Sequence, residues 1–363
     1  MRPTWAEVDL GAIRANTAAV QTRAEPAALM AVVKADGYGH GAGPVAAAAL
    51  EAGATSLAVA LVEEGVALRA RGVRSPILVF AEADVDSVAD ALAADLELMV
   101  ASPGAIAAIA RSAGRGPRVH LKIDTGMHRA GAEIAHVVDL ARQIDDAGLT
   151  LAGVWSHLAT ADEPEHPWSA TQLDRLEQAL TDLRAAGVSW ERTHVANSAG
   201  ALFHPRARFD VVRVGISLYG VAPNPGFDPG VELRPVLSLH SRVVSVRSIE
   251  PGESVSYGAH WTSAEATRIA TVPIGYADGV PRRLGLVGGE VLVRGRRRPI
   301  RGVVTMDQLM IEVDDSVAVG DAVVLLGTQG RETIGAWDWA GPLDTIAYEI
   351  LTGIGPRVPR RYR

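Results

Sequence analysis

Between residues 29 and 214, short apolar segments of β type alternate with alanine-rich segments of helical type. The apolar segments are often β-branched, as is typical of strands that are buried on both faces of a parallel sheet. They are Leu29–Lys34, Ser56–Ala60, Ile77–Phe80, Glu97–Val100, Val119–Ile123, Ala152–His157, Thr193–Ala196 and Val211–Val214. Eight strands alternating with helices make up a (β/α)8 barrel, so this α/β fold is predicted.

A doubly wound open sheet is the alternative arrangement for the same alternation. Such sheets commonly carry a glycine-rich dinucleotide fingerprint at the start of the first helix, and the sequence has none there. The barrel is therefore favoured. The helices expected between its strands are Gly43–Glu51, Val62–Arg71, Asp84–Ala93, Pro103–Ser112, Ile134–Ala147 and Ser169–Ala186.

Helical patterns end near Tyr219, and a turn-rich segment of Pro, Gly, Asn and Asp follows at residues 222–230. We therefore expect residues 1–230 to form the barrel and residues 231–363 to form a C-terminal all-β domain. The strand-like run Thr4–Val8 could pair with either domain. The β-type runs of the second domain are Leu237–Ile249, Thr267–Val272, Glu290–Val293, Ile300–Thr305, Met310–Val313 and Ala322–Leu326.

Composition excludes several classes of function. The chain has no cysteine, which rules out disulfides and Cys-ligated metal centres, and no metal site is expected. Its net charge of −7 offers no basic face to nucleic acid. No apolar run reaches the roughly 18 residues of a membrane helix, and the first residues lack the apolar core of a signal peptide. A soluble cytoplasmic protein is therefore expected.

Two lysines stand out because Lys and Arg total 35, and all the others are arginines. Both Lys34 and Lys122 lie at the ends of predicted strands, where barrel enzymes carry their catalytic residues. Lysine can act as a neutral amine nucleophile, whereas arginine stays charged. The lysines are therefore candidates for covalent chemistry.

Other polar residues follow the later strands. Arg129 comes after the fifth strand, and His157 ends the sixth. The loops after strands seven and eight are the usual phosphate site of this fold, and Ser198 is expected to begin a short helix, Ser198–Phe203, whose free N–H groups suit a phosphate. The neighbouring strand-end residues are Asn197, Arg213, Gly215 and Ile216. A phosphate site beside a lone lysine fits pyridoxal phosphate held as a Schiff base.

The sequence resembles a known family, the pyridoxal-phosphate-dependent alanine racemases. The resemblance runs the whole length of the chain, and it implies a homodimer that interconverts L-alanine and D-alanine and supplies D-alanine for peptidoglycan. It is carried by the segments Val33–Gly41, Lys122–Gly131, Ser156–Asp162, His194–Gly200, Arg213–Gly220, Val255–Gly258, Gly275–Gly279, Thr305–Gln308, Tyr348–Leu351 and Arg357–Arg360.

The resemblance implies a two-base mechanism. Lys34 would hold the cofactor and exchange a proton with the substrate α-carbon on one face. Tyr257, from the β domain of the partner subunit, would act on the opposite face. Arg129 would contact the cofactor and the substrate carboxylate, and the backbone of the partner's Met306 would help to bind that carboxylate.

The same resemblance implies the remaining cofactor contacts. Arg213 would face the pyridine nitrogen, and because a guanidinium only donates, it would leave that nitrogen unprotonated. His157 would orient Arg213. Lys122 would carry a carbamate that holds Arg129, as in many relatives. Further cofactor-binding residues would be Asn197 and, around the phosphate, Tyr38, Ser198, Gly215, Ile216 and Tyr348.

Three positions depart from the pattern of this family. Thr305 stands where many relatives have Cys, Val303 stands where many have Arg, and Trp261 stands where a smaller aromatic is frequent. A serine racemase or an amino-acid decarboxylase of the same architecture is a second interpretation. A non-enzymatic carrier of pyridoxal phosphate is a third, although such relatives resemble the barrel alone. His120 and His194 are interpreted as barrel packing.

Overall fold

The computed structural model describes residues 2–112 and 116–363. The chain forms two compact units. The first, called the barrel unit, contains Ile13–Gly37 and Ala42–Leu233. The second, called the β unit, contains the residues up to Ala12, together with Tyr38–Gly41 and Arg234–Arg363.

The barrel unit is built on an eight-stranded parallel sheet in the order β8-β7-β6-β5-β4-β3-β2-β9. Two backbone hydrogen bonds join the segments around its end strands: Asp210 N donates to Thr193 O over 3.1 Å, and Arg213 N donates to Ala196 O over 2.9 Å. The sheet thus forms a nearly closed barrel, and the predicted (β/α)8 fold is confirmed. Its strands are β2 (Ala28–Val32), β3 (Ser56–Val59), β4 (Ile77–Glu82), β5 (Glu97–Val100), β6 (Arg118–Lys122), β7 (Thr150–Trp155), β8 (Arg192–His194) and β9 (Val211–Val214).

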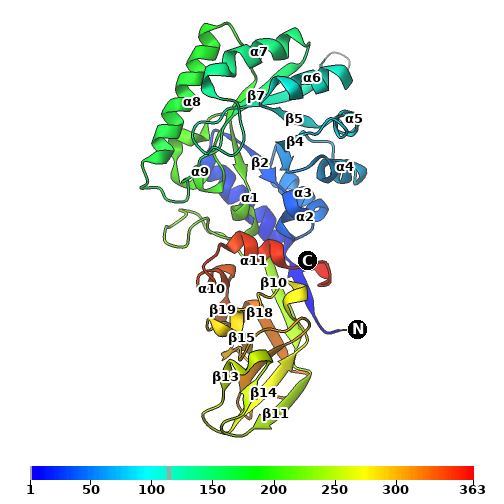
Figure 1. The fold of residues 1–363 in the computed structure, drawn as a ribbon, viewed down its shortest axis with the longest axis vertical. Coiled ribbons are helices and arrows are strands. Elements are labelled where there is room, and N and C mark those ends of the chain that lie inside the picture. Colours follow the sequence, from blue (N-terminus) through cyan, green and yellow to red (C-terminus); the bar gives the residue numbers. More distant parts are fainter. Residues whose placement is uncertain (1, 113–115) are drawn as a thin grey trace. The chain divides into compact units, whose positions relative to one another are not determined.

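Helices cover the outer face of this sheet, as Figure 1 shows for α7 and α8. Helix α7 turns one apolar stripe inward, since Val137, Leu140, Ala141 and Ile144 are its buried residues. Every residue of β3, β5 and β9 is buried, as expected of strands packed on both faces. The helices are α1 (Leu10–Ala24), α2 (Lys34–Tyr38), α3 (Ala42–Glu51), α4 (Val62–Ala70), α5 (Val88–Ala93), α6 (Pro103–Ser112), α7 (Val137–Asp146), α8 (Trp168–Ala185) and α9 (Ser198–Phe203), with 3-10 turns η1 (Ile134–His136), η2 (Pro205–Arg208) and η3 (Ile216–Tyr219).

The β unit contains a main sheet in the order β16-β15-β18-β10-β1-β20, with β19 paired to β18. A second sheet has the order β11-β14-β17, and β12 pairs with β13. The N-terminal strand β1 (Trp5–Val8) is antiparallel to β10 and parallel to β20, so it belongs to this unit. The other elements are β10 (Leu237–Arg242), β11 (Ser245–Ile249), β12 (Ser254–Val255), β13 (Trp261–Thr262), β14 (Thr267–Val272), β15 (Glu290–Val293), β16 (Arg296–Pro299), β17 (Leu309–Val313), β18 (Ala322–Gln329), β19 (Glu332–Ile334), β20 (Arg360–Tyr362), α10 (Ala336–Ala340) and α11 (Ala347–Gly353), with η4 (Tyr257–Ala259), η5 (Tyr276–Asp278) and η6 (Leu284–Leu286).

Two predicted strands of the β unit are wrong. The run Ile300–Thr305 does not form a strand, and Ile300 makes only an isolated bridge with Ile311. The run Leu237–Ile249 is predicted as one continuous strand, but the structure divides it into β10 and β11, which lie in different sheets. A strand that changes sheets has to bend, and the bend here lies between Arg242 and Ser245. No helix within residues 2–112 and 116–363 has the length and apolar character to cross a membrane.

Candidate active site

Lys34 is presented by an unusual backbone turn that follows strand β2. The next three residues all adopt left-handed conformations, with φ and ψ of 51° and 50° at Ala35, 50° and 50° at Asp36, and 61° and 47° at Gly37. Such conformations cost roughly 1 kcal/mol for each residue other than glycine, and backbone strain of this kind gathers at functional sites. Glu64 compensates part of the cost, because its Oε1 accepts a hydrogen bond from Ala35 N over 2.6 Å.

The Lys34 amine is half-buried and makes no hydrogen bond or ion pair with any described residue. Burial, followed by the positive charge of Arg129, lowers its pKa, and the Glu64 carboxylate opposes this shift. A lower pKa gives a larger fraction of neutral amine at neutral pH. The environment therefore favours Lys34 as a nucleophile and as a proton-transfer group.

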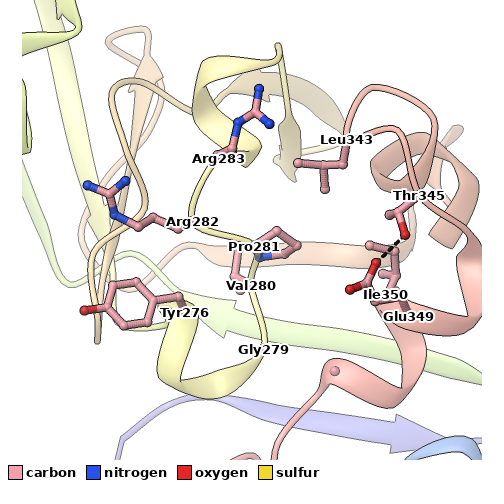
Figure 2. A pocket seen from close by; sticks show the side chains of 11 residues that line it. Tyr276, Gly279, Val280, Pro281, Arg282, Arg283, Leu343, Thr345, Glu349 and Ile350 are labelled. Atoms are coloured by element: carbon pink, nitrogen blue, oxygen red, sulfur yellow. Dashed lines mark hydrogen bonds between the residues drawn. The ribbon is translucent and has the colours of Figure 1, made fainter.

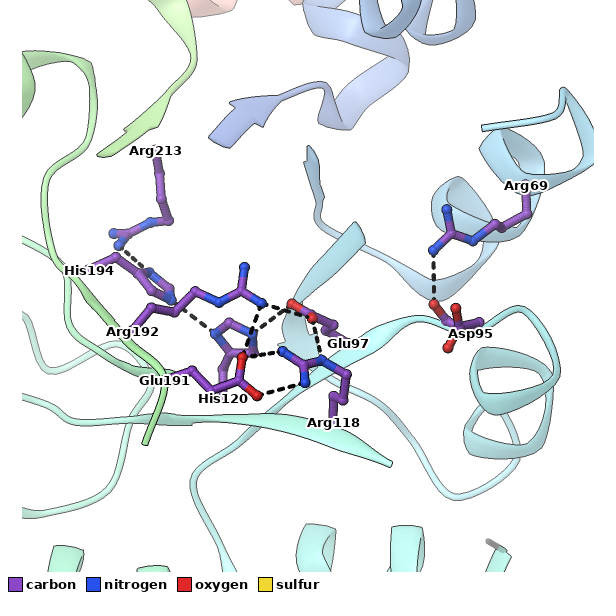
Figure 3. Close-up of polar contacts among 9 residues, drawn as sticks. All are labelled: Arg69, Asp95, Glu97, Arg118, His120, Glu191, Arg192, His194 and Arg213. Carbon is purple, nitrogen blue, oxygen red and sulfur yellow. Dashed lines mark hydrogen bonds and ion pairs between the residues drawn. The ribbon is translucent and has the colours of Figure 1, made fainter. Parts of the chain in front are cut away.

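Arg213, on β9, is buried and hydrogen-bonded on both terminal nitrogens, and Figure 3 shows its hydrogen bond to His194. Its Nη1 donates to Nδ1 of His194 over 2.9 Å, and its Nη2 donates to Nδ1 of His157 over 3.1 Å and to Ser156 O over 2.9 Å. Burial and the charge of Arg213 hold the pKa of both histidines well below the usual range, so they are neutral. Within residues 2–112 and 116–363 Nε of Arg213 has no partner, which leaves one donor for a ligand.

Lys122 ends strand β6 and is only 6% exposed. Its Nζ lies 4.6 Å from the ring centroid of Trp155, and it forms no ion pair within the described part of the chain. Burial first, then the charges of Arg129 and Arg213, lowers the pKa of Lys122 to about 8. Arg129 is exposed and likewise has no hydrogen bond or ion pair among the described residues. These unpaired cations make the site attractive to phosphate and carboxylate groups.

Four of the predicted cofactor-binding residues, Asn197, Ser198, Gly215 and Ile216, lie at or near the start of the short helix α9. Ser198 is buried, and its Oγ accepts hydrogen bonds from Gly215 N over 2.9 Å and from Ser217 N over 3.4 Å. The hydroxyl hydrogen of Ser198 therefore remains available to donate. Asn197 caps the helix, since its Oδ1 accepts from Gly200 N over 2.9 Å. Ile216 follows Gly215 and is fully buried.

The other predicted residues belong to the β unit. Tyr257 is 73% exposed and Met306 is 52% exposed. Tyr38 and Tyr348 form an aromatic pair with ring centroids 6.1 Å apart, and burial, followed by the proximity of Tyr348, raises the pKa of Tyr38. The barrel unit thus contains most of the predicted site residues, namely Lys34, Lys122, Arg129, His157, Asn197, Ser198, Arg213, Gly215 and Ile216, whereas Tyr38, Tyr257, Met306 and Tyr348 belong to the β unit.

A separate hollow of about 400 Å³ lies in the β unit (Figure 2). Tyr276, Arg282 and Arg283 line it on one side, and Thr345 and Glu349 line it on the other. Thr345 donates a hydrogen bond to Glu349, so the only carboxylate of the lining already has a partner. None of the lining residues is among the predicted site residues.

Sequence reasoning missed three residues that support the site. Glu64 holds the turn after Lys34, and His120 and Glu97 continue the hydrogen-bonded chain beyond His194 (Figure 3). His120 and His194 are fully buried, as expected of barrel packing, but they are hydrogen-bonded rather than only packed. Polar residues inside otherwise apolar strands were the available signal. No group of three or more potential metal ligands occurs in the described ranges.

Comparisons with known proteins match alanine racemases over almost the whole chain. The family model "Alanine racemase, N-terminal domain" matches residues 8–223, and "Alanine racemase, C-terminal domain" matches residues 236–362. An alanine racemase of Symbiobacterium thermophilum is 50% identical in an alignment 368 positions long, gaps included, that covers 100% of this chain and 97% of that protein. An alanine racemase of Thermobifida fusca is 44% identical, with coverage of 98% and 97%. The crystal structure of alanine racemase from E. faecalis superposes with a TM-score of 0.94 at 37% identity and covers 98% of that chain and 100% of this one.

Proposed function

The chain belongs to the alanine racemase family, and from this premise we propose that it interconverts L-alanine and D-alanine by a two-base mechanism with pyridoxal phosphate. The observation that carries the proposal is the Lys34 amine, which has no hydrogen-bonding or ionic partner in the described part of the chain and whose pKa is lowered by burial and by Arg129. Racemisation requires one group that removes the α-proton and a second that returns a proton from the other face. Lys34 is proposed as the first group and Tyr257 as the second.

The donor set of the barrel unit fits pyridoxal phosphate. Lys34 offers an amine for the cofactor's aldehyde, Arg213 offers a free Nε–H for a ring nitrogen, and Ser198 offers a hydroxyl hydrogen for a phosphate oxygen. When bound, this cofactor withdraws electrons from the substrate α-carbon and so acidifies its proton. Asn197, Gly215, Ile216, Tyr38 and Tyr348 are proposed to complete its binding site.

Two arginines are proposed to orient the reactants. Arg129, which has no counter-ion among the described residues, would bind the substrate carboxylate, together with the backbone of Met306 from the partner subunit. Arg213 would donate to the ring nitrogen without protonating it, because a guanidinium has no acceptor. An unprotonated ring withdraws electrons less strongly, which favours prompt return of a proton to the α-carbon. His157 would hold Arg213 in this orientation.

Lys122 is proposed to carry a carbamate. Its amine must be neutral to attack CO2, and a pKa of about 8 leaves a useful neutral fraction at neutral pH. The product is an anion in a site that contains Arg129 and Arg213, which form no ion pair with the residues that the structure describes, so Coulomb attraction would stabilise it.

At the level of the cell, we propose a cytoplasmic homodimer that supplies D-alanine for peptidoglycan. The exposure of Tyr257 and Met306 in the single chain supports a site that is completed by a partner. Expression in a bacterial strain that depends on external D-alanine tests the biological role. Growth without added D-alanine is expected, and failure to grow despite soluble protein would count against this role.

The reaction itself is tested with purified protein, pyridoxal phosphate and L-alanine in D₂O. Optical rotation should fall to zero while deuterium appears at the α-carbon of both enantiomers. Release of CO2 and ethylamine would favour a decarboxylase, and a bound cofactor with no α-exchange would favour a carrier. A parallel incubation with L-serine distinguishes alanine preference from broader amino-acid racemisation.

A further inference from the structure

A chain of buried side chains connects Arg213 to a carboxylate deep in the barrel wall (Figure 3). Nη1 of Arg213 lies 2.9 Å from Nδ1 of His194, and Nε2 of His194 lies 2.9 Å from Nδ1 of His120. Nε2 of His120 lies 2.8 Å from Oε2 of Glu97. The two histidines are 0% exposed, Arg213 is 3% exposed and Glu97 is 4% exposed. No water can therefore replace a broken link without a change in packing.

The chemistry of the two ends fixes the direction of these hydrogen bonds. Arginine can only donate, so Nδ1 of His194 accepts and its neutral ring carries hydrogen on Nε2. That hydrogen is donated to Nδ1 of His120, whose ring must then carry hydrogen on Nε2 and donate it to Glu97. An ionised carboxylate can only accept. The donor Arg213 at one end and the acceptor Glu97 at the other end therefore require the same direction for all three hydrogen bonds.

Any change in the protonation of His194, His120 or Glu97 would break one of these hydrogen bonds. A second proton on either imidazole would place two N–H donors against each other. A proton on the Glu97 oxygen that faces His120 would place two donors against each other there. If the hydrogen bonds all reversed instead, Nδ1–H of His194 would face the donor Nη1 of Arg213. Burial lowers the pKa of both imidazoles, which keeps them neutral. Burial would raise the pKa of Glu97, but His120, Arg118 and Arg192 hold it at about 2, so the carboxylate is ionised.

The surrounding structure is built to hold this chain. Oε1 of Glu97 pairs with Arg118 Nε over 2.8 Å and with Arg192 Nη2 over 3.3 Å, which anchors the carboxylate. Gly153, the residue opposite His120 on the neighbouring strand, leaves room for the ring. A Cβ at Gly153 would lie 2.3 Å from Nδ1 of His120, so any side chain there would displace the imidazole.

From this geometry we infer that Glu97 is a positioning residue for Arg213: through the two neutral imidazoles it fixes the direction of the hydrogen bonds and so holds the guanidinium toward the cofactor's ring nitrogen. The inference rests on the proposed function. Its consequence concerns the fate of the substrate, because a displaced Arg213 allows the ring nitrogen to gain a proton and strengthens the electron sink. Glu97 thereby favours racemisation over transamination.

The test compares Glu97→Gln with Glu191→Gln in the holoenzyme. A glutamine at position 97 can donate as well as accept, so the reversed chain becomes possible and His194 loses its bond to Arg213. In the side reaction, alanine leaves its amino group on pyridoxal phosphate, giving pyruvate and pyridoxamine phosphate. We expect pyruvate per racemisation event to rise about tenfold in E97Q, the usual order of effect when an orienting partner is lost. E191Q removes a carboxylate that pairs with Arg118 over 2.6 Å but leaves the chain intact, and it should behave as wild type.

A second measurement does not depend on activity. In protein labelled with ¹⁵N in the histidine rings, wild-type His120 and His194 should both be neutral with hydrogen on Nε2, and E97Q should show a second tautomer. Gly153→Ala breaks the chain at His120 with Glu97 in place, and it should also raise pyruvate. Other tautomers in the wild type, or equal pyruvate ratios in E97Q and E191Q, would overturn the inference. A wild type with the expected tautomers but no racemisation would instead refute the proposed function alone.

Discussion

Lys34 and Lys122 are cations for which the described part of the fold supplies no hydrogen-bonded counter-ion. A buried or half-buried ammonium without a partner pays a desolvation cost that shows as a lowered pKa, and such groups gather at functional sites. Both lysines occupy the ends of barrel strands or the turn that follows, where ligands of this fold bind. The two residues nevertheless lead to different predictions, because one is proposed to react with the cofactor and the other with CO2.

Replacement of Lys34 tests the covalent role. Lys34→Ala should abolish the visible absorbance of the lysine-bound cofactor and should lower racemisation by about 10³-fold or more, since a proton-transfer group is lost as well. Lys34→Arg keeps the positive charge but cannot form the bond, and it should lose the same absorbance. Absorption and chirality assays on both variants check this. An unchanged visible spectrum in either variant contradicts the assignment.

Replacement of Lys122 tests its buried charge through the pH dependence of stability. Below pH 8 Lys122 is charged in both folded and unfolded chains, so the full desolvation cost destabilises the fold. Between about 8 and 10.5 only the unfolded chain remains protonated, and stability rises with pH. In CO2-free buffer Lys122→Met should therefore raise the free energy of unfolding at pH 7, by roughly 3 kcal/mol at most, and this gain should vanish by pH 10.5.

Urea titrations at the two pH values measure the effect, with wild type as the reference. Bicarbonate should shrink the difference, because a carbamate would turn the costly cation into an anion among cations, and mass spectrometry should detect one added CO2. A stability gain that is the same at both pH values would show that packing rather than charge is responsible.

At the scale of elements, the turn α2 decides where Lys34 points. The apolar run Leu29–Lys34 predicted a strand that reaches the lysine, but β2 ends at Val32. Strand propensity describes the apolar residues well, whereas the left-handed turn depends on hydrogen bonds to Glu64 and Asp36, which no local pattern announces. The sequence therefore predicted the position of Lys34 along the barrel but not the backbone that presents it.

The hydrogen bonds from Arg213 through His194 and His120 to Glu97 also depend on contacts that no local sequence pattern announces. Apolar strand patterns predicted that His120 and His194 are buried, and the structure agrees. The pairing itself could not be predicted, because the two residues are 74 positions apart and meet across β7, the strand that lies between β6 and β8 in the sheet. Some helix ends in the barrel were predicted closely: α6 has the expected bounds, and α8 differs by one residue at each end, whereas the helix expected from Asp84 begins only at Val88.

The role of Glu64 in stabilising the turn after Lys34 is tested by comparing Glu64→Ala with Glu63→Ala. Glu64 accepts hydrogen bonds from Ala35 N and from Ala60 N over 2.7 Å, so Glu64→Ala leaves strained backbone without its charged acceptor. We expect the free energy of unfolding to fall by about 1–3 kcal/mol and pyridoxal phosphate to dissociate more readily. Glu63→Ala changes the exposed neighbour, which has no such contact, and should leave both properties unchanged. Thermal denaturation and cofactor titration measure the two effects, and equal behaviour of the variants would refute the role of Glu64.

At the scale of the whole molecule, the proposed second base lies on a surface that the single chain leaves open. Tyr257 follows Ser256, which has a positive φ of 71° and donates through its Oγ to Val303 O over 2.7 Å. The loop that carries Tyr257 is thus fixed although its ring is 73% exposed. A fixed but exposed aromatic residue is typical of a surface that a partner covers. A homodimer with two shared sites would provide that partner for both chains.

Complementation between two inactive variants tests this shared arrangement. If each site takes Lys34 from one chain and Tyr257 from the other, a heterodimer of Lys34→Ala and Tyr257→Phe has one site with both lesions and one site with neither. Random pairing places about half of all dimers in this state, so about a quarter of wild-type sites should recover. If each site took both residues from one chain, every site in every pairing would carry a lesion, and no activity could return.

The control replaces Tyr257→Phe by the double variant Lys34→Ala/Tyr257→Phe. Mixed with Lys34→Ala, it gives dimers in which both sites lack the lysine under either arrangement, so mixing and refolding alone should restore nothing. Recovery must therefore depend on an intact Lys34 in one chain and an intact Tyr257 in the other. Because proton transfer requires both groups within reach of the same α-carbon, such recovery would show that they meet across the subunit boundary. Inactive heterodimers of verified composition would instead assign both groups to one chain or require a different second base.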